Sequence, residues 1–236
     1  MLHVKHSYEG GFDLPIYNSV LKQIDPVETK RYAGLGKVDF NETVIQKACL
    51  EAQLLATPKG IWQMYNYNAC NYTIESNPEF LISGEKIRKH LATAAKVIIL
   101  AVTIGEAIEK QITDYFKQGE YSYSLLLDAA ATTAVEQAAD DVEKTIKQYI
   151  TAKGYQMIWR FSPGYGDWDI RIQPEMLRLA GAKGIGITLT ESMMLIPRKS
   201  ITAIIGLVPN STEKSEVKQS CSACTKQDCL ARRRSS

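Results

Sequence analysis

The sequence predicts an α+β fold, because long helices and an antiparallel hairpin occur in the same chain. Residues 121–153 contain no proline or glycine and are rich in alanine, which predicts one long helix. Residues 186–196 and 201–208 predict two strands joined by a turn at Pro197–Ser200, a hairpin in the middle of a sheet. The chain has 236 residues, of which 45% are hydrophobic and 23% charged, so it can bury a sizeable core.

The N-terminal half predicts both helices and strands. Asp25 followed by Pro26 indicates a helix start, because aspartate caps a helix and proline fits its first turn. From Ile61 the side chains alternate, which is the pattern of a strand with two different faces. The expected helices are 27–32, 41–57 and 83–95, and the expected strands are 61–68, 72–74, 80–82 and 96–102.

Further elements are expected after the long helix. Residues 155–159 and 170–172 predict strands, and a short helix starts near Pro174 and ends by Gly181. The glycines at 181, 184 and 186 lack the spacing and the lysine of a phosphate-binding loop, so they predict a flexible connection.

Composition excludes several classes of protein. A formal charge of +2, with no basic stripe before the last few residues, argues against nucleic-acid binding. The longest apolar run, residues 97–102, is far too short to span a membrane. The first residues lack the apolar segment of a signal peptide, so we expect a cytoplasmic protein with reduced cysteines.

The segment Arg160–Trp168 places proline and glycine between aromatic residues, which is typical of a surface turn. Its proline fixes φ and its glycines permit left-handed backbone, so main-chain groups can face a ligand. At the end of a strand, the guanidinium of Arg160 can fork onto a carboxylate, and Tyr165 can stack on a flat partner. From this segment alone, an aromatic turn that caps the core is an equally favoured alternative.

Glu136 lies on the predicted long helix. Residues Ala129, Thr132 and Thr133 precede it at three- and four-residue steps, so small neighbours leave space beside its carboxylate. Without other information, a solvated helix charge is the favoured interpretation, because buried glutamates are scarce.

A resemblance decides between these alternatives. Arg160-x-x-Pro163-Gly164-Tyr165 is followed by residues 187–194, ITLTESMM, and then by Pro197-x-x-Ser200. In this order and spacing the motifs resemble the activation domain of vitamin B12-dependent methionine synthase, most closely over residues 91–208. The resemblance implies a curved, mostly antiparallel sheet flanked by helices. Because no methyltransferase or cobalamin module precedes these residues, we expect a free-standing version that acts on a separate partner.

The resemblance also implies a function: reductive reactivation of a cobalamin-dependent methionine synthase, as a component of that enzyme. S-adenosylmethionine donates a methyl group to cobalamin that has been reduced again from its inactive Co(II) state. The partner carries the cobalamin, and flavodoxin or ferredoxin is the implied electron donor. Two alternatives stay open, namely reactivation of another corrinoid methyltransferase and a non-catalytic interaction module that kept the fold but lost the ligand.

Four residues are implied to bind S-adenosylmethionine or cobalamin, and no catalytic residue is expected, because no general base is needed. Arg160 is expected to hold the methionyl carboxylate, and Glu136 polar or cationic groups. The main chain of Ser162 is expected to face the adenine or ribose, and Tyr165 the corrin of the partner. The family's N-terminal aspartate ligand has no clear match in this chain, whose candidates are Asp13, Asp25 and Asp39.

The C-terminal residues differ in character from the rest. We expect one globular domain at 1–209, followed by a polar linker and a cysteine-rich basic tail at 210–236. Cys221, Cys224 and Cys229 are spaced closely enough to bind zinc or an iron–sulfur cluster, although four ligands are the rule and no fourth is obvious nearby. A redox-sensitive tail without metal is an equally favoured alternative.

Overall fold

A computed structural model describes residues 16–210 of the chain. Its α-helices are α1 (Pro26–Tyr32), α2 (Glu42–Leu55), α3 (Glu85–His90), α4 (Ala107–Lys117), α5 (Tyr121–Thr151) and α6 (Gln173–Ala180). Its strands are β1 (Lys59–Asn68), β2 (Thr73–Ile74), β3 (Phe80–Leu81), β4 (Lys96–Thr103), β5 (Tyr155–Met157), β6 (Thr188–Leu189), β7 (Leu195–Ile196) and β8 (Ser200–Pro209).

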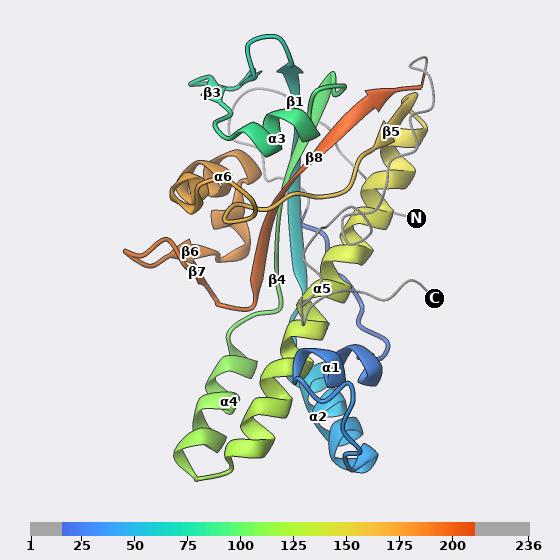
Figure 1. The fold of residues 1–236 in the computed structure, drawn as a ribbon, viewed down its shortest axis with the longest axis vertical. Helices are drawn as coiled ribbons and strands as arrows, with labels where there is room; N and C mark the ends of the chain where they lie inside the picture. The colour runs from blue at the N-terminus through green and yellow to red at the C-terminus, as the bar shows by residue number, and fades with distance from the viewer. Residues whose placement is uncertain (1–15, 211–236) are drawn as a thin grey trace.

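Six of the strands in residues 16–210 form one antiparallel sheet in the order β3-β2-β1-β4-β8-β5. Helix α5 runs along one face of this sheet, and α3 and α6 lie on the other (Figure 1). The predicted α+β fold, with an antiparallel sheet flanked by helices, is therefore confirmed.

Strand β4 is central, because it pairs with β1 on one side and with β8 on the other. Its side chains are buried on both faces: Ile98 and Leu100 pack toward α5, whereas Ile99 packs toward α3 and α6. This two-sided burial explains why the sequence of β4 reads as a continuous apolar run.

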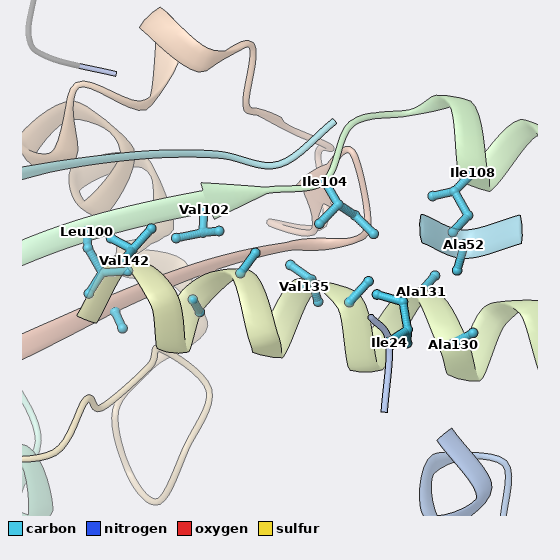
Figure 2. Packing of buried hydrophobic residues seen from close by; sticks show 14 of the residues in the cluster. Ile24, Ala52, Leu100, Val102, Ile104, Ile108, Ala130, Ala131, Val135 and Val142 are labelled. Carbon is cyan, nitrogen blue, oxygen red and sulfur yellow. The ribbon is translucent and has the colours of Figure 1, made fainter. Parts of the chain in front are cut away.

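Helix α5 packs against the sheet through Val142, which lies beside Leu100 of β4, whereas Ala130 and Ala131 lie farther along the helix, beyond the end of β4 (Figure 2). Val142 of this helix packs directly over β1. A Cβ atom added to Gly60 would lie 2.5 Å from Cγ2 of Val142, so this crossing requires glycine on the strand. The close approach fixes α5, and with it the polar residues on the flank of α5, relative to the sheet.

Three predictions about the helices and turns were wrong. The helix expected at 83–95 ends at His90, because the amide of Ala95 already donates to the carbonyl of Leu207 on β8. Residues 170–172 form a 3-10 helix, η1, instead of a strand, since the carboxylate of Asp169 caps its start. The expected flexible connection at Gly181–Gly186 contains a second 3-10 helix, η2 (Ala182–Ile185), whose two end residues are buried.

The predicted hairpin was also wrong in its pairing. Strand β7 pairs with β6 in a separate two-stranded sheet, whereas β8 joins β4 and β5 in the large sheet. Pro197 has no amide hydrogen to continue the β7 ladder, and the amide of Lys199 donates to Glu109 of α4 (2.8 Å). The chain therefore leaves one sheet before β8 begins in the other.

Within residues 16–210, none of the helices combines the length and the apolar character that crossing a membrane requires. Asp13 and the cysteines of the predicted tail, Cys221, Cys224 and Cys229, lie outside the described residues.

Candidate functional site

Strand β5 leads into Arg160 through an irregular stretch of backbone. The amide of Ile158 donates to the carbonyl of Gly206 on β8 (3.0 Å), and Phe161 exchanges two hydrogen bonds with Ile204 (2.9 and 2.8 Å). The chain therefore advances by three residues from Ile158 to Phe161, while β8 advances by only two, from Gly206 to Ile204. This arrangement is a β-bulge between Ile158 and Phe161.

The bulge shifts the alternation of side chains across the sheet by one residue. Ile158, Trp159 and Phe161 all pack in the hydrophobic cluster on the α3 and α6 side. Arg160 lies between them and points to the other side, where it contacts α5. In an unbroken strand Arg160 would share the face of Ile158, two residues earlier. The bulge therefore decides which face of the sheet receives the guanidinium.

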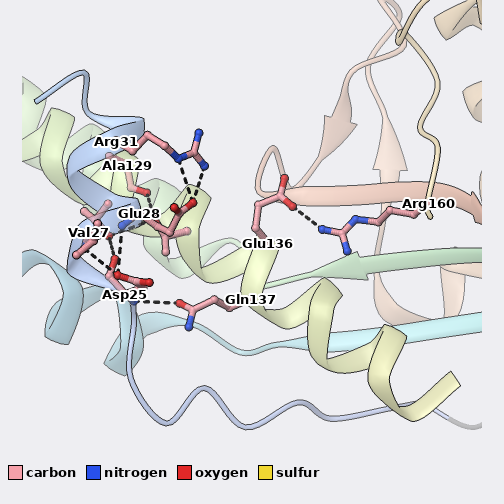
Figure 3. A network of polar contacts seen from close by, with 10 residues as sticks. Asp25, Val27, Glu28, Arg31, Ala129, Glu136, Gln137 and Arg160 are labelled. Atoms are coloured by element: carbon pink, nitrogen blue, oxygen red, sulfur yellow. Dashed lines mark hydrogen bonds and ion pairs between the residues drawn. The ribbon is translucent and has the colours of Figure 1, made fainter. Parts of the chain in front are cut away.

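The guanidinium of Arg160 meets Glu136, Asp140 and Glu143, which we call the α5 carboxylate cluster. Nη2 lies 2.7 Å from Oε2 of Glu136, and Nη1 lies 2.7 Å from Oδ1 of Asp140 and 3.0 Å from Oε1 of Glu143 (Figure 3 shows the contact with Glu136). The cluster forms because residues four and three apart share one helix face. Only 18% of the Arg160 side chain is exposed, so these ion pairs are partly shielded from water.

Charge is unbalanced at this contact, since one guanidinium faces three carboxylates within residues 16–210. Burial opposes the charge of Arg160, but the cluster outweighs burial and raises the pKa of Arg160 above its ordinary value. Burial also raises the pKa of Glu143, and the nearby Arg160 only partly offsets that effect. The site therefore favours a further positive charge.

Next to the cluster, a hollow of about 270 Å³ lies between α1 and α5. Glu136 and Asp140 border it, so these carboxylates lie between Arg160 and the hollow. Its lining residues are Asp25, Glu28, Tyr32, Thr133, Glu136, Gln137 and Asp140. Most of the lining is acidic or polar, which suits a ligand with cationic and hydrogen-bonding groups.

The start of α1 is fixed against α5 at this hollow (Figure 3). Oδ1 of Asp25 accepts from the amides of Val27 and Glu28 (2.8 and 3.2 Å), and the amide of Asp25 donates to Oε1 of Gln137 (3.2 Å). Glu28 is paired with Arg31 (2.6 Å). Sequence analysis found no clear N-terminal aspartate for the site, whereas the structure brings Asp25 to the same hollow as Glu136.

The turn after Arg160 is anchored at both ends. The amide of Gly164, at φ +86°, donates to the carbonyl of Trp168 (2.8 Å), whose indole is 1% exposed in the core. Asp167 accepts from the amides of Glu85 and Lys86 (2.7 and 3.1 Å) and so caps α3. The turn is therefore partly a core cap, as one interpretation of the sequence held, yet it exposes 67% of Tyr165.

The structure thus joins two of the predicted site residues directly, Glu136 and Arg160. Ser162 and Tyr165 follow on the turn, where the amide of Tyr165 donates to the carbonyl of Ser162 (3.3 Å). Sequence reasoning gave no role to Asp140 and Glu143, although their spacing from Glu136 along one helix face was the available signal. Among the described residues, no group of three or more histidine, cysteine or acidic side chains could hold a metal ion.

Comparison with known proteins places the chain in a family. A family model for the vitamin B12-dependent methionine synthase activation domain matches residues 87–222, which is more than half of the chain. A solved structure described as the MetH reactivation domain bound to AdoHcy is similar, with a TM-score of 0.55 and 14% identity over 86% of this chain and 81% of that one. At this identity the likeness concerns the fold. No curated protein matches the sequence. The family match nevertheless shows that the chain belongs to the vitamin B12-dependent methionine synthase activation domain family.

Proposed function

We propose that this chain binds S-adenosylmethionine and assists reductive reactivation of cobalamin on a separate cobalamin-dependent methionine synthase. The observation that carries the proposal is the placement of the family-motif residue Arg160 against acidic residues that border a hollow. S-adenosylmethionine supplies the methyl group for the reduced cobalamin, and flavodoxin or ferredoxin supplies the electron. The similar fold that holds AdoHcy supports the choice of ligand, because AdoHcy is what remains after the methyl group leaves.

The charges of the site suit this ligand. S-adenosylmethionine brings one carboxylate and two cationic groups, an ammonium and a sulfonium. Arg160 forks onto the carboxylate, and Glu136 and Asp140 accept the ammonium or lie near the sulfonium. Because Arg160 is already paired, binding is an exchange of partners: the ligand's carboxylate replaces at least one carboxylate of the α5 cluster, and the displaced oxygen turns to a cationic group of the ligand.

Other groups complete the proposed pocket. Asp25 lines the hollow from the α1 side and is our candidate for the family's N-terminal aspartate ligand. The carbonyl of Ser162 has a second lone pair beside the one used by Tyr165, and it faces the adenine or ribose in this proposal. The exposed ring of Tyr165 provides a flat apolar surface for the partner's corrin.

The remaining predictions belong to the same proposal. Residues 1–209 form the working domain, residues 210–236 are an appended tail, and the protein acts in the cytoplasm. Metal binding by Cys221, Cys224 and Cys229 stays a prediction, testable by metal analysis of the purified full chain.

One observation favours a second candidate, a non-catalytic interaction module. The α5 carboxylate cluster already satisfies the guanidinium of Arg160 without any ligand. In that case the ion pairs would serve only to join β5 to α5, and S-adenosylmethionine would not bind.

Calorimetric titration of S-adenosylmethionine into the full chain tests the two candidates. We expect saturable binding that weakens about 10- to 100-fold in Arg160→Lys, which keeps the charge but cannot fork, and in Glu136→Gln. Arg171→Ala is the matched control, because Arg171 is an exposed arginine paired only locally with Asp169 among the described residues. Absence of binding by the wild-type chain, alone and with a cobalamin-loaded partner, would favour the interaction module.

A further inference from the structure

The bulge before Arg160 leaves a backbone carbonyl that the sheet does not bond. Within residues 16–210, β5 is the last strand of the large sheet, so a carbonyl turned away from β8 meets no other strand of this part of the chain. The carbonyl of Trp159 lies instead 2.9 Å from Nε2 of His90, the last residue of α3. Since a carbonyl only accepts, Nε2 must carry the hydrogen of this bond.

Packing holds His90 in place over the bulge. Its ring lies 4.0 Å from the ring of Trp159 and 5.5 Å from that of Phe161, measured between centroids. Burial lowers the pKa of His90, with the bond to Trp159 acting against this effect, so burial favours the neutral ring. The neutral ring keeps its hydrogen on Nε2, because the bond to Trp159 selects that tautomer.

Gly206 on β8 lies opposite Ile158, where the bulge begins. A Cβ atom there would lie 2.6 Å from Cδ1 of Ile158, so the bulged strand packs onto bare backbone. His90 therefore contacts the bulge through a hydrogen bond, and Gly206 accommodates it through the absence of a side chain.

We propose that His90 is a positioning residue for the ligand site: by bonding the carbonyl of Trp159 it holds the bulge that turns Arg160 toward α5. The inference rests on the proposed function of that site. His90 itself packs on the α3 face, away from the α5 carboxylate cluster, and acts through Arg160.

Loss of the bond between His90 and Trp159 would change how the strand before Arg160 pairs with β8. Without a donor, the carbonyl of Trp159 is left half-buried and unpaired, and the bulge loses the contact that favours it over an unbroken strand. A strand without the bulge places Arg160 on the α3 face and breaks its ion pairs with α5. Even partial loss of the bulge lowers the fraction of molecules in which Arg160 is correctly placed.

The first test needs no ligand. Nuclear magnetic resonance of the full chain resolves the Nε–H signal of Arg160, assigned by its loss in Arg160→Lys. His90→Gln places a side-chain N–H near the position of Nε2 and should leave this signal in place. His90→Leu has no donor and should broaden or shift it. An unchanged Arg160 signal in folded His90→Leu would overturn the inference.

The second test measures binding of S-adenosylmethionine. We expect His90→Leu to weaken binding about tenfold, as expected for one hydrogen bond and the buried group it leaves unpaired, and His90→Gln to restore most of the loss. In the Arg160→Lys background, His90→Leu should weaken binding no further, because both changes act through the same side chain. Independent, additive losses would overturn the inference.

The two tests separate the inference from the proposed function. If the wild-type chain binds no S-adenosylmethionine, either alone or with a cobalamin-loaded partner, the proposed function fails, and the Arg160 signal still decides the role of His90. If His90→Leu does not fold, His90→Phe keeps a ring beside Trp159 but has no N–H donor, and it should change the same signal. Retention of the wild-type signal in folded His90→Phe would count against the inference.

Discussion

Replacing Arg160 by alanine should destabilise the fold as well as weaken ligand binding. The change leaves Glu136, Asp140 and Glu143 without the cation that they share. Removing one partner of a fully buried ion pair costs about 3–5 kcal/mol. The cluster's side chains keep 24–36% of their surface exposed, so we expect a smaller loss of about 2–3 kcal/mol. For a domain of this size that loss corresponds to a fall in Tm of about 4–12 °C.

The loss should depend on pH in a defined direction. Burial already raises the pKa of Glu143, and removing Arg160 takes away the charge that opposes this rise. A carboxyl group whose pKa is higher in the folded state favours folding when protonated, so its penalty is greatest at pH 7. As the pH falls through the raised pKa, the penalty disappears. The destabilisation caused by Arg160→Ala should therefore be smaller at pH 5 than at pH 7.

Urea denaturation of wild type and variant, followed by circular dichroism at both pH values, measures these losses. Arg171→Ala is the control, because Arg171 is 81% exposed and should give no measurable change. A loss below about 0.5 kcal/mol at pH 7, or an equal loss at both pH values, would refute the argument that the cluster depends on Arg160.

Further changes test other features by the same denaturation assay. Gly206→Ala should cost about 1–3 kcal/mol, because the new methyl group overlaps Ile158; a neutral result would mean that the bulge yields easily. Tyr67→Phe should be neutral or stabilising by up to ~1 kcal/mol, since the buried hydroxyl has no hydrogen-bond partner among residues 16–210; a large loss would reveal a partner. Because burial lowers the pKa of His90, the neutral ring contributes stability that is present above about pH 6.5 and is lost as the pH falls. His90→Gln should therefore reduce the change in unfolding free energy with pH below about pH 6.5. An unaltered dependence of stability on pH would contradict the burial of this ring.

Much of the fold follows from sequence periodicity. Helix α5 is evident because 31 residues without proline or glycine carry an alanine-rich face, and β4 because it is apolar throughout. The predicted hairpin of residues 186–196 with 201–208 was wrong because strand pairing depends on tertiary contacts. The break at Pro197 separates two sheets, and only the fold shows that β8 belongs between β4 and β5.

Less of the candidate site than of the fold could be predicted from the sequence. Resemblance identified Glu136 and Arg160, and the structure brings them within 2.7 Å of each other. The bulge could not be foreseen, since nothing in the residue types around Trp159 distinguishes a bulged strand from a regular one. The contact between His90 and the carbonyl of Trp159 was equally hidden, because residue types alone do not place the end of α3 against the strand before Arg160.

In the proposed function, Arg160 exchanges carboxylates of α5 for the carboxylate of S-adenosylmethionine. A crystal structure of the full chain grown with the ligand would show this exchange. We expect a forked pair between Arg160 and the methionyl carboxylate, with Glu136 or Asp140 turned to a cationic group of the ligand. A ligand bound elsewhere, with Arg160 still paired with Glu136, Asp140 and Glu143, would contradict the proposed exchange.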